Sequence, residues 1–129
     1  MKEQYELEFV LPVSPKLLYQ LISTEEGLSK WFADRVNIQK DNLTFVWSKE
    51  NFEAKILAQK ECKFFKYAWL EDIESNNNYF VEFSISSNQN DNSTILKITD
   101  FTDPHERNEN IMLWNSNIDQ LKRAMGING

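Results

Sequence analysis

The sequence has 129 residues and a formal net charge of −6 at pH 7, with 41% hydrophobic and 13% aromatic residues. This length can bury a real core as one domain, residues 1–129, and the negative charge argues against nucleic acid as a partner. No apolar run approaches the length that spans a bilayer, so no integral membrane segment is expected. A single cysteine, Cys62, excludes an internal disulfide and fits a reducing compartment, so a cytoplasmic location is expected.

The first part of the chain predicts one strand followed by two short helices. Residues 4–11 alternate between polar and apolar side chains, which is typical of a half-buried strand. The Ser-Pro pair at 14–15 matches a helix N-cap and first helical residue, and an apolar helix face follows it. A second short helix is predicted to begin at 24–26 and to end near 31–32, with Gly27 as a weak point.

From Val36 onward, alternating segments recur at roughly ten-residue spacing with short polar turns between them. This spacing predicts an antiparallel meander, in which Glu74 to Asn78 forms one of the turns. The small residues Ala54 and Ala58 are predicted to face inward, opposite large rings. The side chains predicted to face inward are Leu43, Phe45, Trp47, Phe52, Ala54, Ile56, Phe65, Tyr67, Trp69, Val81, Phe83, Leu96 and Ile98.

The stretch from Asp103 to Gly126 predicts one long C-terminal helix. Asp103 suits the N-cap, Pro104 the first helical position, and Gly126 the left-handed position after the last turn. Arg107 projects onto the centre of the helix's apolar face, one turn before that face begins. The apolar stripe steps by three and four residues and consists of Ile111, Trp114, Ile118, Leu121 and Met125.

Two segments carry a resemblance to a known family. The segment LPVSPKLLYQLISTEEGLSKWFAD near the start and LWNSNIDQLKRAMG at the end resemble the START-like, helix-grip superfamily, which includes polyketide cyclases and activators of a chaperone ATPase. The resemblance implies an α+β fold: a curved antiparallel sheet of six to seven strands around a long C-terminal helix, with two short helices after the first strand. The chaperone activators usually have a glycine-rich segment before the last helix. This sequence lacks it and resembles short START-like proteins more closely.

Members of this superfamily enclose an apolar cavity between sheet and helix, so the resemblance implies that this chain binds a small apolar or amphipathic ligand, such as a lipid. Pockets of this kind are mostly apolar with a few polar anchors. A fully packed core explains the same apolar pattern, and the sequence does not separate the two readings. The predicted ligand-binding residues, with the first two on the lid of the cavity, are Trp31, Phe32, Trp47, Tyr67, Trp69, Phe83, Asp100, Arg107 and Trp114.

Three polar side chains could serve such a cavity. Asp100 shares its strand face with Leu96 and Ile98, so it is predicted to point inward near Arg107, where the two could form a partly buried ion pair. Alternatively, Arg107 lies in water, or it anchors an anionic group at the cavity mouth. The Tyr67 hydroxyl is the best candidate for a polar anchor inside the cavity.

The sequence predicts no catalytic residue, no metal site and no cofactor. His105 is the only histidine and falls away from the apolar stripe, which leaves no partner for serine or cysteine nucleophiles and too few ligands for zinc. An enzyme of this fold would have only Asp100, Arg107 and Tyr67 to use. A protein-interaction module resembling the chaperone ATPase activators is the alternative function. An exposed Met112 would then suggest a homodimer or another protein partner.

Overall fold

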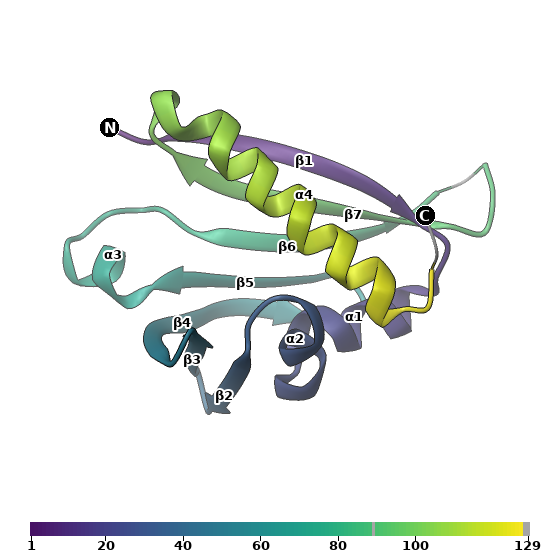
Figure 1. Ribbon diagram of the computed structural model, residues 1–129, viewed down its shortest axis with the longest axis horizontal. Helices are drawn as coiled ribbons and strands as arrows, with labels where there is room; N and C mark the ends of the chain where they lie inside the picture. The colour runs from purple at the N-terminus through teal and green to yellow at the C-terminus, as the bar shows by residue number, and fades with distance from the viewer. Residues whose placement is uncertain (89, 128–129) are drawn as a thin grey trace.

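Seven antiparallel strands form one sheet in the order β1-β7-β6-β5-β4-β3-β2. The computed structural model describes residues 1–88 and 90–127. The strands are β1 (Glu3–Leu11), β2 (Arg35–Gln39), β3 (Asn42–Trp47), β4 (Glu50–Lys60), β5 (Phe64–Trp69), β6 (Val81–Ser87) and β7 (Thr94–Thr102). Figure 1 shows the long helix α4 (Arg107–Ala124) crossing one face of this sheet diagonally. The predicted α+β, helix-grip architecture is therefore confirmed.

The two short helices, α1 (Pro15–Ser23) and α2 (Glu25–Trp31), pack tightly against each other. Thr24 caps α2, because its hydroxyl accepts a hydrogen bond from the Gly27 N–H at 2.9 Å. A Cβ atom on Gly27 would lie only 2.1 Å from the Gln20 carbonyl oxygen. Gly27 therefore does not mark a weak point in the helix. It allows the two helix backbones to approach each other closely.

The structure corrects two sequence-based expectations near β4 and β5. A bulge in β4 shifts the register between Ile56, which pairs with Tyr67, and Ala58, which pairs with Lys66. Ala58 is consequently exposed, and the prediction that it faces inward is wrong. A short helix, α3 (Leu70–Glu74), also lies between β5 and β6, where the sequence predicted only a polar turn.

The C-terminal helix begins later than predicted. A 3-10 turn, η1 (Pro104–Glu106), precedes α4, and the Asp103 side chain makes no capping hydrogen bond. The Asp103 carboxylate instead lies 3.9 Å from the N-terminal amine. The end of the helix is as predicted, since Gly126 adopts a left-handed φ of 78°. No helix in the described part of the chain is long and apolar enough to cross a membrane.

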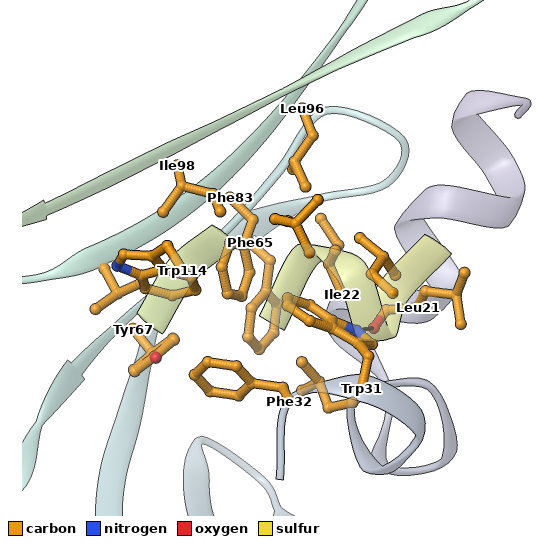
Figure 2. Packing of buried hydrophobic residues seen from close by; sticks show 14 of the residues in the cluster. Leu21, Ile22, Trp31, Phe32, Phe65, Tyr67, Phe83, Leu96, Ile98 and Trp114 are labelled. Atoms are coloured by element: carbon orange, nitrogen blue, oxygen red, sulfur yellow. Dashed lines mark hydrogen bonds between the residues drawn. The ribbon is translucent and has the colours of Figure 1, made fainter. Parts of the chain in front are cut away.

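The core lies between the inner face of the sheet and the three helices α1, α2 and α4. The stripe of α4 is confirmed as its buried face, because Trp114, Ile118 and Leu121 are buried. Figure 2 shows the rings of Trp114 and Tyr67 at one end of this core and Leu21, Ile22 and Trp31 at the other. The largest fully buried side chains include Tyr67, Phe45, Phe65 and Phe83.

Candidate functional site

Asp100, near the end of β7, accepts hydrogen bonds from both the first strand and the last helix. Its Oδ2 accepts from the Tyr5 hydroxyl at 3.1 Å and from the Trp114 indole N–H at 3.0 Å. Its Oδ1 accepts from the Phe101 backbone N–H at 2.8 Å. Burial raises the pKa of the Asp100 carboxyl, and these hydrogen bonds offset only part of that effect because they favour the charged form. The sequence pattern correctly predicted that this carboxyl points inward.

The possible ion pair between Asp100 and Arg107 does not form, and the alternative expectation, that Arg107 lies in water, is confirmed. Arg107 is exposed at the first residue of α4, with its guanidinium carbon 6.0 Å from the centre of the Tyr5 ring. The Tyr5 hydroxyl, rather than Arg107, donates to the Asp100 carboxylate. Tyr5 was not identified as a site residue, because only the pairing of β1 with β7 places it opposite Asp100.

Tyr67 lies on β5 at the centre of the inner face, and its side chain is fully buried. Its hydroxyl has no hydrogen-bond partner. Burial, and then the negative charge of Asp100, raise the pKa of Tyr67 well above its ordinary value, so the hydroxyl stays neutral. A buried hydroxyl that makes no hydrogen bond destabilises the folded state, and such groups are rare in native proteins. This group is therefore the one polar atom of the described inner face that calls for an explanation.

Tyr67 and the large rings around it form a continuous layer. We call this layer the inner wall, and it consists of Phe32, Phe45, Tyr67, Phe83 and Trp114. Phe32, at the end of α2, stacks on Trp114 with ring centres 5.7 Å apart and planes 11° apart. Phe83 meets Trp114 edge-on at 5.8 Å. The end of α2 thus packs directly onto α4, and these rings fill the space between sheet and helix at this point (Figure 2).

An open pocket of about 600 Å³ adjoins the inner wall at the ends of β3, β4 and β5, beside α3. We call it the mouth pocket. The Trp47 ring centre lies 5.5 Å from that of Phe52 and 6.2 Å from that of Trp69. By strand alternation these three rings share the face that carries the core. The mouth pocket is lined by Trp47, Asn51, Phe52, Glu53, Trp69, Leu70, Glu71 and Glu74.

A second groove, of about 510 Å³, runs between α2 and α4. Trp31, Phe32 and Trp47 line it together with polar side chains of α4. The indole N–H groups of the two tryptophans are already satisfied, since Trp31 donates to the Leu21 carbonyl at 2.7 Å and Trp47 to the Phe32 carbonyl at 2.8 Å. The rings of this groove therefore offer apolar surface rather than hydrogen bonds.

The nine residues predicted to line a cavity thus fall into three places. Trp31, Trp47 and Trp69 line the open mouth pocket or the α2–α4 groove, and Phe32 both lines the groove and belongs to the inner wall. Tyr67, Phe83 and Trp114 belong to the packed inner wall, with Asp100 beside Trp114 and Arg107 exposed at its edge. The prediction omitted Phe52 and the α3 residues, although the alternation along β4 had already placed Phe52 on the inner face.

One side-chain group in the described residues has ligand atoms close enough to hold a metal ion. Donor atoms of Asp103, His105 and Glu106 all lie within 4.8 Å of one another at the 3-10 turn. His105 and Glu106 are exposed, as expected for a solvated first turn, and the Asp103 carboxylate already faces the N-terminal amine. This group therefore has no feature beyond proximity that would select a metal.

An antiparallel sheet crossed by a long C-terminal helix, with two short helices after the first strand, is the fold of a START-like protein. Comparison with known proteins agrees. Residues 1–127 match the START-like superfamily domain, and the chain belongs to that superfamily. A comparison with curated proteins found no match.

Several solved structures share the fold. A Bacteroides fragilis protein solved by NMR in solution is 34% identical, with a TM-score of 0.68 over 99% of this chain and 94% of that one. The Aha1 dimer from Colwellia psychrerythraea is 17% identical, with a TM-score of 0.78 over 95% of each chain. CalU16 from Micromonospora echinospora is 13% identical, with a TM-score of 0.73 over 95% of this chain and 75% of that one.

Proposed function

We propose that residues 1–129 act as one non-catalytic domain that binds a small apolar or amphipathic molecule on the inner face of the sheet. The mouth pocket carries the proposal. It is open, floored by three large rings, and continuous with the aromatic inner wall. Phe52 is 40% exposed there, although a ring of that size is normally covered.

The packed inner wall fits this proposal if the ligand enters through the mouth pocket. The Trp69 ring lines the pocket and lies 5.4 Å from the Tyr67 ring, so it contacts both the pocket and the ring that carries the buried hydroxyl. A ligand that displaces the Trp69 ring would reach Tyr67 and supply the hydrogen bond that its hydroxyl lacks. The rings of the wall would then contact the apolar body of the ligand.

Native mass spectrometry of the purified protein tests this proposal, together with titration of straight-chain C8 amphiphiles followed by tryptophan fluorescence. We expect saturable binding that Trp69→Ala alters and that Leu113→Ala, on the outer face of α4, leaves unchanged. Trp69→Ala removes a ring of the pocket, whereas Leu113 is remote from it. The proposal fails if no co-purified small molecule is found and no C8 compound binds saturably.

A protein-interaction module is the second candidate function. The observation that favours it is a pair of adjacent apolar side chains on the solvent face of α4, Met112 at 70% and Leu113 at 63% exposure. The similar Aha1 structure is described as a dimer, which makes a homodimer through this face the simplest form of the idea. Sedimentation of the native protein beside a Met112→Ser, Leu113→Ser double variant would test it. Identical monomeric behaviour of the two proteins would remove this candidate.

A further inference from the structure

Asp100 is an inward-facing carboxylate without a positively charged partner. Among the described residues, the ion pairs shorter than 4.0 Å involve three other carboxylates and leave Asp100 out. Three hydrogen bonds reach it, two at Oδ2 and one at Oδ1. A carboxylate can accept about four, so Oδ1 retains an acceptor position.

The mouth pocket carries charge of the same sign. Glu53, Glu71 and Glu74 line it, and no lysine, arginine or histidine does. Charges of one sign around a concave, low-dielectric surface attract ligands of the opposite sign and repel those of the same sign. A ligand that passes from the mouth pocket to the inner wall therefore meets negative potential at both ends of its path.

Two positive side chains on the Asp100 side of the inner wall, Arg107 and Lys2, do not reverse this sign. The Arg107 guanidinium is exposed over the Tyr5 ring, where water screens it. The Lys2 ammonium lies 5.2 Å from the centre of the Tyr79 ring. Its attraction for Asp100 is the weakest of the influences on the pKa of that carboxyl, and burial is the strongest. Neither side chain is placed to neutralise the inner carboxylate.

We infer that the ligand is an apolar chain or ring with a primary ammonium group, and that Asp100 and the Tyr67 hydroxyl receive this group at the inner wall. An ammonium has three donors, which match the free acceptor position of Asp100 and the lone pairs of the unpartnered Tyr67 oxygen. The aromatic rings of the wall add a favourable cation–π contribution. The inference rests on the proposed function and specifies the charge of its ligand.

Three probes of one chain length test this inference: octylamine, octanol and octanoate, titrated by calorimetry at pH 7. The apolar contribution is nearly the same in all three, so the order of affinities reports the polar end. We expect octylamine to bind at least about tenfold more tightly than octanoate, with octanol between them. Octanoate binding as tightly as octylamine, or more tightly, would overturn the inference while leaving the proposed function standing. Failure of all three to bind would instead count against the proposed function.

Matched variants identify the residue that recognises the ammonium group. Asp100→Asn removes the charge but keeps the shape and an acceptor, so the affinity for octylamine should fall to that for octanol, which should itself not change. Asp119→Asn makes the same change of net charge on an exposed part of α4 and should preserve the order of affinities. If octylamine keeps its advantage in Asp100→Asn, the assignment to Asp100 is wrong.

Tyr67→Phe provides an independent reading if Asp100→Asn does not fold. It removes an oxygen that has no partner in the protein, so the fold should tolerate it. The inference expects a several-fold loss of octylamine affinity in this variant and a smaller change for octanoate. An unchanged octylamine affinity would contradict the role given to Tyr67.

Discussion

The inner wall and the floor of the mouth pocket are both made of large aromatic rings, yet one is packed and the other is open. At the inner wall, Phe83 has no exposed surface, because α4 and the end of α2 cover it. At the mouth pocket, Phe52 lies on the same face of the sheet but keeps 40% of its surface exposed. Side-chain type alone therefore does not decide whether a set of rings forms a core or a binding surface. The covering helices decide it.

Truncating one ring in each region should give the largest difference. Phe83→Ala should lower the free energy of unfolding by about 4 kcal/mol, because it leaves a cavity in a fully buried layer. Phe52→Ala should cost below about 1 kcal/mol, since much of that ring already contacts water. Urea denaturation of both variants measures the difference. Equal losses would mean that the mouth pocket is closed in solution.

Gly27→Ala should give the next largest effect, because it disturbs the α1–α2 pair that brings Phe32 onto Trp114. Alanine in a helix gains about 1 kcal/mol over glycine, but here its Cβ would meet backbone atoms of Gln20 and Leu21 at 2.1 and 2.6 Å. Backbone cannot rotate away, so we expect a net loss of about 2–3 kcal/mol. Gly126→Ala is the control: nothing lies within 4 Å of that Cβ, and only the positive φ opposes it. A more stable Gly27→Ala would refute the close approach.

Tyr67→Phe should have a smaller effect, and in the opposite direction. The hydroxyl is buried without a partner, so its removal should leave the free energy of unfolding unchanged or raise it by about 1 kcal/mol. Tyr5→Phe is the matched comparison, because its hydroxyl donates to Asp100 and its loss should be destabilising. Thermal denaturation of both variants distinguishes the two hydroxyls. A strongly destabilised Tyr67→Phe would show that its hydroxyl has a partner in solution.

The pH dependence set by Asp100 should be the smallest effect, because its hydrogen bonds offset part of the cost of burial. Its pKa in the folded protein is raised above the ordinary 3.8. The folded state therefore binds more protons than the unfolded state as pH rises from about 3.8 through the raised value, and stability falls across that window. Comparing urea midpoints of the native protein and Asp100→Asn from pH 3 to 7 isolates this contribution. The difference should shift against the native protein as pH rises, and the opposite trend would reject the raised pKa.

Sequence patterns predicted much of the fold, because the helix stripe and the strand alternation both follow from local periodicity. The buried positions of Trp114, Ile118 and Leu121 are confirmed for that reason. The β4 bulge was missed, since one extra residue in a strand leaves the local composition unchanged. The short helix α3 was not predicted either, because five residues are too few to show a helical period.

The candidate site was predicted only in part. The inward direction of Asp100 followed from alternation, but its partners did not, because Tyr5 and Trp114 lie 95 and 14 residues away in sequence. The possible ion pair with Arg107 was inferred from the place of Asp100 at a strand end beside the last helix, but Arg107 is exposed and Tyr5 and Trp114 donate to Asp100 instead. Whether rings are covered or open depends on how helices lie over the sheet, and residue types do not encode that.

The position of β1 has a consequence for the order in which the molecule forms. Among the described strands, β1 lies at one edge of the sheet and pairs only with β7, the last strand in sequence (Figure 1). Strands β2 to β7 pair with sequence neighbours and can assemble hairpin by hairpin, whereas β1 must wait until β7 exists. During synthesis β1 therefore has no strand partner until β7 has been made. The Tyr5–Asp100–Trp114 hydrogen bonds would then form late, and they join the first strand to the last strand and to α4.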